Sequence, residues 1–598
     1  MGPGGRSGWH IDYRMAIPTE VSSILAIDIG SVNTQAVLVA LVEGSFRFVA
    51  RAQSPTTQEE PWADVAIGVR HAIEQLQRVS ARPLLSDDGN VLSPEHDDGS
   101  GVDLCVITSS AAQPLRLVLA GLVSELSLDS ARRAAAGTYS SVEDVISLLG
   151  TGRKSDEMRA KSILAVQPDA VCIAGGTDGG STTPVLNLVE SVALGASLID
   201  PLARPTIVYA GNSALRARVK EIVGNDISLV AVEGNVRPAL GTEDLGPLQA
   251  ELDALHASTK LSEVNGLSEC AAWSSIPVLS TARSFGNVVR YLSMIGDPRA
   301  GTLGVDVGAS NTMVGAAFNG KLQLTVRSDI GSAYGGSRLL SEAKIANVAR
   351  WLPFQVHPTD LEAFVIDKEL RPLTIPADGR ELLIEQALAR EAIRSIVKLA
   401  QPSWRRLAPR SRGAARPMFE RIVGAGAVIA KATRPGQAAL LLLDALEPIG
   451  VFELLIDVYG LMPALGAAAI AHPLSVVQTI ENKGLMSLGT VVVPTGTARP
   501  GEVVLGLKMS YEGGGDLEVE VAAGTLEVLP LPPGMKATLR LQPRRGIDIG
   551  RVRKSIPVEG GALGLIVDAR GRPLARHLPS DPEMRRDQIQ QWLWDMGA

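Results

Sequence analysis

The 598-residue sequence predicts an α/β protein of several domains, and three observations support that prediction. Short, continuously apolar runs rich in β-branched residues alternate with helix-like stretches, as buried parallel strands and their connecting helices do. One strand–turn–strand sequence occurs twice. Near the C-terminus the pattern changes to period-two alternation broken by Gly and Pro, which predicts a small antiparallel β-module.

The first predicted lobe covers residues 23–300 and follows a disordered tail over residues 1–22. It is predicted to contain an α/β insertion around residues 182–280. Segment 106–123 is predicted to form a strand, a Ser/Ala turn and an apolar helix. The other elements expected here are strands at 24–28, 36–42, 103–108, 169–176, 206–211 and 228–232, and helices at 62–80 and 143–150.

Residues 301–498 predict a second α/β lobe, and residues 499–598 predict the β-rich module. A long helical run in the second lobe covers 381–401, and the Pro/Arg-rich segment after it, 401–417, predicts a loop. The module contains alternating runs at 502–511, 517–531 and 536–543 and ends in an amphipathic helix over 582–597. We expect Trp592 and Leu593 of that helix to dock on the module.

The composition excludes several classes of protein. The chain is 45% apolar with a net charge of −7, which excludes a disordered chain and disfavours a nucleic-acid binder. Cys105, Cys172 and Cys270 are far apart in the sequence and form no C-x-x-C pair, which disfavours a cysteine-ligated metal site and fits a reducing compartment. No apolar run is long enough to span a bilayer. Together with the net charge and the cysteine spacing, this predicts a cytoplasmic protein that binds neither nucleic acid nor membrane.

The repeated sequence is the most informative motif. Residues 26–34 read AIDIGSVNT and residues 304–312 read GVDVGASNT, so D-[IV]-G-[SA]-x-N-T recurs at an offset of 306 − 28 = 278 residues. Each copy lies between two apolar runs, which predicts a β-hairpin whose tight turn gathers backbone N–H and hydroxyl groups into an anion nest. One copy alone is typical of an ordinary turn. Two copies at equivalent points predict paired phosphate-binding hairpins that close on one nucleotide in a cleft between two lobes.

Two glycine-rich segments add to this prediction. RIVGAGAVIAKA (421–432) predicts a strand, a G-A-G turn and a helix start, where backbone can approach a flat ligand. CIAGGTDGGSTTPVLN (172–187) predicts a strand, a glycine-rich loop and a helix. Ligands of α/β sheets bind at such loops, so Asp178 is a candidate to position a water or to hold Mg²⁺ through water. The alternative is that Asp178 braces the turn or caps the helix.

The order of hairpin, strand, hairpin and G-x-G turn resembles the actin/sugar-kinase/heat-shock-chaperone ATPase superfamily. With segments 106–123, 172–187 and 207–219 the sequence resembles, more narrowly, the glutamate mutase accessory family, called MutL and unrelated to the mismatch-repair protein of that name. The specific segment is A-G-G-T-D-G-G, and the resemblance extends with gaps from about residue 24 to about residue 495. It implies duplicated, ribonuclease H-like actin-like ATPase lobes, ATP or ADP with Mg²⁺ as cofactors, and an adenosylcobalamin-dependent mutase, such as glutamate mutase, as partner.

The expected nucleotide-binding residues share small or hydroxyl-bearing side chains in turns and loops. They are Gly30, Ser31, Asn33, Thr34, Gly308, Ala309, Ser310, Asn311, Thr312, Gly175, Gly176, Thr177, Gly424 and Gly426. Asp28 and Asp306 are expected to hold Mg²⁺ through water, since Mg²⁺ keeps several waters and takes one or two carboxylates. Asp178 is the expected catalytic carboxylate.

Two positions depart from the family pattern. Relatives usually carry Lys directly after the first-turn Thr and Asp directly after the second-turn Thr, whereas this chain has Gln35 and Met313. A missing Lys removes a point charge for phosphate or the transition state. We therefore expect nucleotide binding with slow hydrolysis.

Other functions stay open. A small-molecule kinase of the same fold would use Asp178 as its base. An iron–sulfur activator of this fold would need a dimer to share its cysteines, and a non-catalytic scaffold would keep only the fold. The sequence does not identify the client, the oligomeric state or the role of the β-module.

Overall fold

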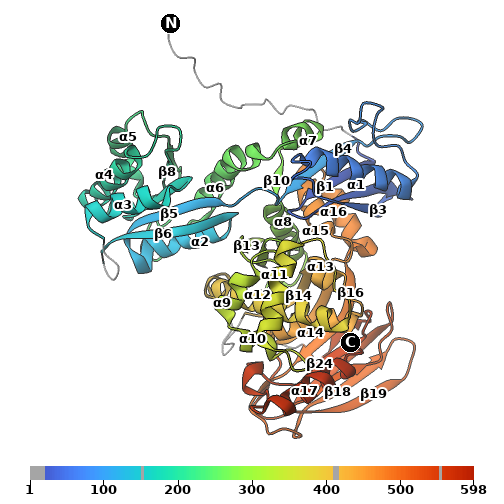
Figure 1. The fold of residues 1–598 in the computed structure, drawn as a ribbon. Coiled ribbons are helices and arrows are strands. Elements are labelled where there is room, and N and C mark those ends of the chain that lie inside the picture. Colours follow the sequence, from blue (N-terminus) through green and yellow to red (C-terminus); the bar gives the residue numbers. More distant parts are fainter. Residues whose placement is uncertain (1–19, 150–153, 409–416, 551–554) are drawn as a thin grey trace. The chain divides into compact units, whose positions relative to one another are not determined.

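The computed structural model describes residues 20–149, 154–408, 417–550 and 555–598 (Figure 1). Almost all of the predicted tail over 1–22 lies outside these ranges. The chain divides into two compact units. The first comprises the described residues up to 111 with 262–287 and 461–484, and the second comprises those in 112–261, 288–460 and 485–598. Among the described helices, none combines the length and apolar character needed to cross a membrane.

The first unit is built on one mixed five-stranded sheet. Its elements are β1 (Ser23–Ile29), β2 (Asn33–Val42), β3 (Ser45–Pro55), α1 (Val65–Ser80), β4 (Leu104–Ser109), α7 (Leu267–Trp273), β10 (Leu279–Ser280), the start of α8 (Thr281–Met294), α15 (Leu461–Ala471) and α16 (Pro473–Thr479). The strand order is β10-β4-β1-β2-β3, with β1, β2 and β3 antiparallel and β4 and β10 parallel to β1. The Asp64 side chain caps α1 at the amide of Ala66, and α1 buries one apolar face that includes Val69 and Leu76.

The main sheet of the second unit repeats this order. Its elements are β11 (Gly301–Val307), β12 (Thr312–Phe318), β13 (Lys321–Arg327), α9 (Gly336–Ala343), α10 (Ile345–Ala349), α11 (Pro358–Leu370), α12 (Gly379–Leu407), β14 (Phe419–Ala425), α13 (Ala427–Ala430), α14 (Pro435–Leu446), β15 (Gly450–Ile456) and β16 (Met486–Val493). The five strands β13-β12-β11-β14-β15 match β3-β2-β1-β4-β10 in order and direction. This duplication confirms the predicted fold of two ribonuclease H-like lobes.

Helix α12 is longer than predicted. A loop was expected to begin at residue 401, but the helix continues to Leu407 with Pro402 inside it. The final turn is retained because Trp404 is buried and packs edge-on against Phe419 of β14. Residues 409–416 of the predicted loop lie outside the described ranges.

A separate parallel sheet lies within residues 112–261, which we call the inserted domain. Its elements are β5 (Leu115–Val123), α2 (Asp129–Ala136), β6 (Ser140–Leu149), α3 (Asp156–Val166), β7 (Ala170–Ala174), α4 (Thr183–Ser197), β8 (Thr206–Tyr209), α5 (Arg216–Val223), β9 (Leu229–Ala231) and α6 (Gly246–Thr259). The strand order is β6-β5-β7-β8-β9, all parallel. The domain therefore begins earlier in the chain than the insertion around 182–280 that the sequence predicts.

Two helices predicted in this region are strands in the structure. The apolar run expected as a helix at the end of segment 106–123 is β5, and residues 143–149 of the helix predicted over 143–150 belong to β6, while residue 150 lies outside the described ranges. Strand β5 lies between β6 and β7, and its alternate side chains enter the two different cores on either face of the sheet. A strand buried on both faces is continuously apolar, so its sequence does not alternate and a short run cannot be told from a buried helix.

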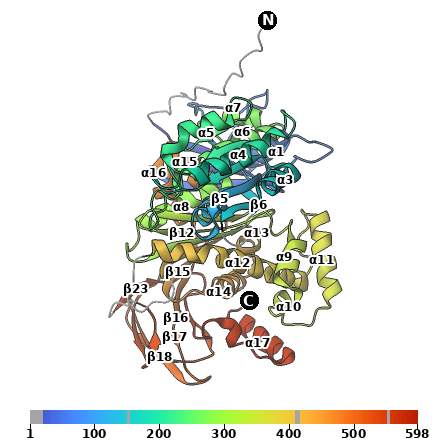
Figure 2. The ribbon, with the colours of Figure 1, turned by 90° about the vertical axis from the view of Figure 1, so that its left-hand side faces the viewer.

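The C-terminal region forms the predicted antiparallel module and also extends the second lobe (Figure 2). Its elements are β17 (Thr495–Gly496), β18 (Val503–Tyr511), β19 (Asp516–Ala522), β20 (Leu526–Leu529), β21 (Lys536–Pro543), β22 (Ile547–Asp548), β23 (Ile556–Glu559), β24 (Leu565–Asp568) and α17 (Pro582–Asp595). Strands β19-β18-β21-β23 form an antiparallel sheet, whereas β24 and β20 continue the main sheet beyond β16. Trp592 and Leu593 are buried as expected, but in the core that includes α12 and α14 of the second lobe.

Candidate functional site

The two repeated sequences form the same tight turn. We call residues 28–34 the first turn and residues 306–312 the second turn. The amide of Gly30 donates to the carbonyl of Asn33 at 3.1 Å, and the amide of Gly308 donates to the carbonyl of Asn311 at 2.9 Å. A Cβ on Gly30 would lie 2.7 Å from the Asn33 carbonyl oxygen, so this turn requires glycine.

The side chains of the turns differ in exposure, and Asn311 at the second turn is buried. Ser31, Asn33, Ala309 and Ser310 are partly or fully exposed at the tips, where a ligand can reach them. The two threonines are buried: the Thr34 hydroxyl lies 2.9 Å from the Thr56 hydroxyl, and the Thr312 hydroxyl donates to the Ile330 carbonyl at 2.9 Å. Each threonine therefore ties its turn to the segment after the third strand, and its contact with a nucleotide stays a prediction.

Asp28 lies at the end of β1 without a cationic partner among the described residues. The hydroxyls of Thr108 and Thr281 donate to its Oδ1 at 2.6 and 2.7 Å, and no described residue donates to Oδ2. Burial raises the pKa of Asp28 and outweighs the lowering effect of these two hydrogen bonds. A cation or a cation-bound water at Oδ2 would relieve the cost of burying this charge.

Asp306 occupies the equivalent position at the end of β11 and is buried. Its strand neighbours are Met313 of β12 and Ala425 of β14. In the first lobe the residue opposite Asp28 is Gln35, whose amide oxygen accepts from the Gln53 side chain at 2.8 Å. Directly opposite residues of antiparallel strands share one face, so the two departures from the family pattern lie beside the two aspartates.

The predicted G-A-G turn follows β14, next to the second turn in the same sheet. Gly426 has φ +89°, and a Cβ there would lie 2.2 Å from the Val307 carbonyl oxygen. A Cβ on Gly424 would meet the side chains of Leu442 and Ile429 at 2.8 and 2.9 Å. Both glycines are thus required by close packing, and their contact with a nucleotide remains untested.

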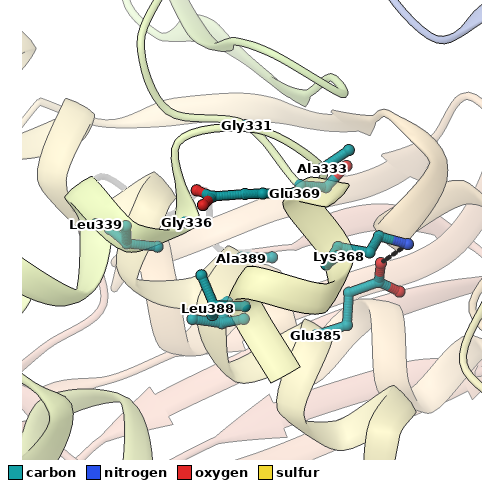
Figure 3. A pocket seen from close by; sticks show the side chains of 11 residues that line it. Gly331, Ala333, Gly336, Leu339, Lys368, Glu369, Glu385, Leu388 and Ala389 are labelled. Atoms are coloured by element: carbon teal, nitrogen blue, oxygen red, sulfur yellow. Dashed lines mark ion pairs between the residues drawn. The ribbon is translucent and has the colours of Figure 1, made fainter. Parts of the chain in front are cut away.

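A small pocket adjoins the second turn (Figure 3). The segment after β13 forms one wall and hydrogen-bonds to the turn, since Ser332 and Ala333 donate their amides to the carbonyls of Gly308 and Ala309. Lys368 pairs with Glu385 at 3.1 Å on the other side. The lining residues are Gly331, Ser332, Ala333, Gly336, Leu339, Val365, Lys368, Glu369, Glu385, Leu388 and Ala389. The pocket therefore offers both charged and apolar groups beside the turn.

Asp178 lies in the inserted domain, in the loop after β7. Its Oδ1 accepts from the amide of Ser213 at 2.9 Å and from the Asn235 side chain at 3.0 Å. The backbone hydrogen bond from Ser213 is the main reason that the pKa of Asp178 is lowered. No hydrogen bond or ion pair found among the described residues connects this carboxylate to the second turn, so its catalytic role stays a prediction. The bracing alternative has direct support from these bonds.

The donor set around Asp28 suits Mg²⁺ held through water. Within the ranges described above, no three His, Cys, Asp or Glu side chains gather in a way that could enclose a metal ion. Mg²⁺ does not need such a cage, because it is commonly bound by one or two carboxylates, waters and substrate phosphates. Asp28 supplies a carboxylate oxygen that no described donor uses.

Sequence reasoning missed the residues that support Asp28 and the pocket. Thr108 was visible in a Ser/Thr-rich turn after an apolar strand, which is a weak signal. Thr281 is 253 residues from Asp28 in the sequence and gave no signal. Lys368 and Glu385 come from two helices and were equally hidden.

Comparisons with known proteins identify relatives. A family model described as MutL protein matches residues 24–483. The chain is 24% identical to the protein MutL of Clostridium tetanomorphum over 392 residues, which cover 62% of this chain and 77% of that protein.

Solved structures with similar chains include nucleotide-free acetone carboxylase, with 13% identity, a TM-score of 0.32 and coverage of 84% of this chain and 81% of that one. A nucleotide-free diol dehydratase-reactivating factor has 12% identity, a TM-score of 0.28 and coverage of 78% and 100%. The xylulose kinase of Bifidobacterium adolescentis has 11% identity, a TM-score of 0.28 and coverage of 79% and 96%.

Proposed function

The chain belongs to the MutL protein family, and from this premise we propose that it is a nucleotide-binding accessory protein, with slow ATPase activity, for an adenosylcobalamin-dependent mutase. The observation that carries the nucleotide part is the pair of matching turns, each closed by a glycine-to-asparagine hydrogen bond and each beginning with an aspartate near the end of a strand, Asp28 in β1 and Asp306 in β11. A chance recurrence of a turn sequence would not reproduce both features at the same place in two lobes.

The turns supply the groups that bind phosphate. Amides and hydroxyls at the tips, including those of Ser31 and Ser310, donate hydrogen bonds to phosphate oxygens. Asp28 and Asp306 accept hydrogen bonds from Mg²⁺-bound waters, and the ion when bound neutralises phosphate charge. The pocket beside the second turn is suited to the nucleoside, since Lys368 and Glu385 can hydrogen-bond to ribose hydroxyls and Leu388 can contact the base.

We expect hydrolysis to be slow for a physical reason. Catalysis of phosphoryl transfer depends on positioned charges that stabilise the transition state. This chain has a neutral amide at Gln35 and an apolar side chain at Met313, the positions directly opposite the two aspartates. Asp178 remains the predicted catalytic carboxylate, and Gly175, Gly176 and Thr177 the predicted contacts beside it. Asp178→Asn should abolish hydrolysis if that prediction is correct.

Isothermal calorimetry with Mg·ATP and Mg·ADP tests the nucleotide proposal. We expect saturable binding that weakens at least tenfold in Lys368→Gln. Lys398→Gln is the matched control, because Lys398 is exposed on the same helix as Glu385 and lies outside the pocket. No binding heat and no change in melting temperature at millimolar nucleotide would refute the proposal.

The client is tested with a mutase from the same source. Mutase turnover is measured after its cofactor has been inactivated, with and without this protein and ATP. Recovery that needs both supports the accessory role, and equal recovery without this protein contradicts it. A fast ATPase that requires a sugar, polyol or carboxylate would instead favour the kinase alternative.

A further inference from the structure

We propose that Tyr139 of the inserted domain is a positioning residue for the second turn, whose hydroxyl orients the hydroxyl of Ser310 toward a bound phosphate group. The proposal rests on the proposed function, since it assumes that the second turn binds the phosphate groups of a nucleotide. It adds to that function a residue from outside the two lobes. The inserted domain and the second turn belong to the same compact unit.

The Tyr139 side chain reaches the tip of the second turn. Its hydroxyl oxygen lies 3.4 Å from the hydroxyl oxygen of Ser310, at the long end of hydrogen-bonding distance. Tyr139 is 5% exposed, whereas Ser310 is only partly buried. The contact therefore leaves Ser310 accessible to a ligand while Tyr139 holds it from the buried side.

The hydroxyl of Tyr139 is a neutral group that can donate one hydrogen bond and accept another. Burial raises its pKa, and hydrogen bonds with Ser310 and Asn311 oppose that rise only in part, so the hydroxyl keeps its proton at neutral pH. It can accept from the Asn311 amide group and donate to the Ser310 oxygen. The Ser310 hydroxyl can then donate its own proton to a phosphate oxygen. Because linked hydrogen bonds polarise one another, this arrangement makes Ser310 a stronger donor.

The two turns differ at the residue next to this contact. Asn33 of the first turn is exposed, whereas its counterpart Asn311 is 3% exposed. The Oδ1 of Asn311 is buried and has no hydrogen-bond donor among the described residues. It faces Gly308, since a Cβ on that glycine would lie 3.2 Å from it. An unsatisfied buried acceptor is costly, and a water bound together with the nucleotide would satisfy it.

The inserted domain fixes the Tyr139 ring from behind. The ring of His256 on α6 packs against it nearly edge-on, with centroids 5.4 Å apart and an interplanar angle of 70°. His256 is itself buried, and its Nε2 donates to the Gln113 carbonyl at 3.2 Å. The carbonyl of Tyr139 accepts from the amide of Leu115 at 3.1 Å. A side chain already held in this way loses little further entropy when it holds Ser310.

A second contact ties the same corner of the inserted domain to the second lobe. The hydroxyl of Ser328, directly after β13, donates to the carbonyl of Ser140 at 3.3 Å. A Cβ on Gly137 would lie 3.2 Å from the Leu324 carbonyl oxygen of β13, so the backbones approach closely there. Tyr139 thus lies between two positions that contact the second lobe, and its place beside the turn does not depend on its hydroxyl.

The experiment is a double-mutant cycle on the Kd for Mg·ATP, measured by isothermal calorimetry on the full chain. Tyr139→Phe keeps the ring and its contact with His256, and we expect it to raise the Kd at least fivefold. In a Ser310→Ala background the same change should alter the Kd less than twofold, because the group through which Tyr139 acts is gone. The matched control is Tyr511→Phe in the β-module, where the hydroxyl donates to the Pro530 carbonyl at 2.8 Å, and it should bind as the wild type does.

Two results would overturn the proposal. They are an unchanged Kd in Tyr139→Phe, and an equal loss of affinity with and without the Ser310 hydroxyl, which would assign Tyr139 a packing role alone. If Ser310→Ala binds too weakly for calorimetry, the rise in melting temperature at millimolar Mg·ATP supplies the affinities for the cycle. A wild type that binds no Mg·ATP would refute the proposed function, whereas a wild type that binds while Tyr139→Phe binds equally well would refute this inference alone.

Discussion

Replacement of Asp28 by Asn should separate stability from function in the first turn. Burial raises the pKa of Asp28, so near that pKa the folded state binds more protons at this group than the unfolded state does. The contribution of Asp28 to stability therefore falls as pH rises from its unfolded pKa through its folded pKa, and at neutral pH the ionised carboxylate is unfavourable. Asn keeps an oxygen that can accept from Thr108 and Thr281 but removes the charge. We expect the melting temperature of the nucleotide-free variant to equal or exceed that of the wild type.

The same change should weaken binding of Mg·ATP. A ligand at one hundred times its Kd stabilises the native state by about 2.7 kcal/mol, and a tenfold higher Kd reduces this to about 1.4 kcal/mol. A difference of about 1.3 kcal/mol corresponds to a few degrees in melting temperature for a unit of roughly 150–250 residues. Asp28→Asn should thus lose a few degrees of the Mg·ATP-induced shift. The effect should disappear when EDTA removes the metal.

Differential scanning calorimetry with and without Mg·ATP measures both quantities. Asp87→Asn is the matched control, since Asp87 is exposed in a loop of the same unit. A lower melting temperature of nucleotide-free Asp28→Asn, or a full Mg·ATP shift in this variant, would refute the prediction.

Three other substitutions test the second turn, the catalytic departure and the C-terminal region. Gly308→Val should weaken nucleotide binding, measured by calorimetry with or without metal, at least tenfold. The reason is that its Cβ would lie 3.2 Å from the Asn311 carbonyl oxygen and distort the turn. Unchanged affinity would mean that the turn does not bind phosphate. Gln35→Lys should raise the ATPase rate at least tenfold in a phosphate-release assay, because it places a cation opposite Asp28; an unchanged rate would show that the missing lysine does not limit hydrolysis. Arg570→Met should lower the free energy of unfolding, measured by urea titration, by about 3–5 kcal/mol, because fully buried Arg570 pairs with buried Asp568 and Asp444. The control is Arg576→Met at an exposed position. A loss in Arg570→Met no larger than that in the control would contradict this prediction.

The buried ion pair also predicts a pH dependence. Burial alone would raise the pKa of Asp568, but Arg570 and Arg572 lower it well below its ordinary value. A carboxyl with a lowered folded pKa contributes stability above its unfolded pKa, and that contribution is lost as pH falls. We therefore expect the free energy of unfolding to fall more between pH 7 and a pH below 4 in the wild type than in Arg570→Met. Urea titrations of both proteins at the two pH values measure this difference. Parallel curves would contradict the prediction.

The sequence by itself determined the features that depend on local chemistry. The two turns were predictable because a tight hairpin requires a glycine, a small residue and an amide or hydroxyl at fixed spacing, and the printed motif shows all three twice. The strand–loop–helix at 170–197 was predictable for the same reason, since glycines interrupt an apolar run and Pro184 starts the helix. The fold class followed from finding the same turn at equivalent points of two α/β regions.

The tertiary structure decided everything that depends on which segments become neighbours. Strand β5 could not be told from a helix, because its two apolar faces are satisfied by cores on both sides of a sheet that the sequence does not show. Helix α12 continues beyond Pro402 because Trp404 packs against Phe419. Strand β24 joins the sheet of the second lobe because it pairs with β16. Asp28 contacts Thr281 only in the folded chain, because 253 positions separate the two residues in the sequence. Backbone turns are determined by neighbouring residues in the chain, whereas burial, pairing and the pKa of a carboxyl are determined by neighbours in space.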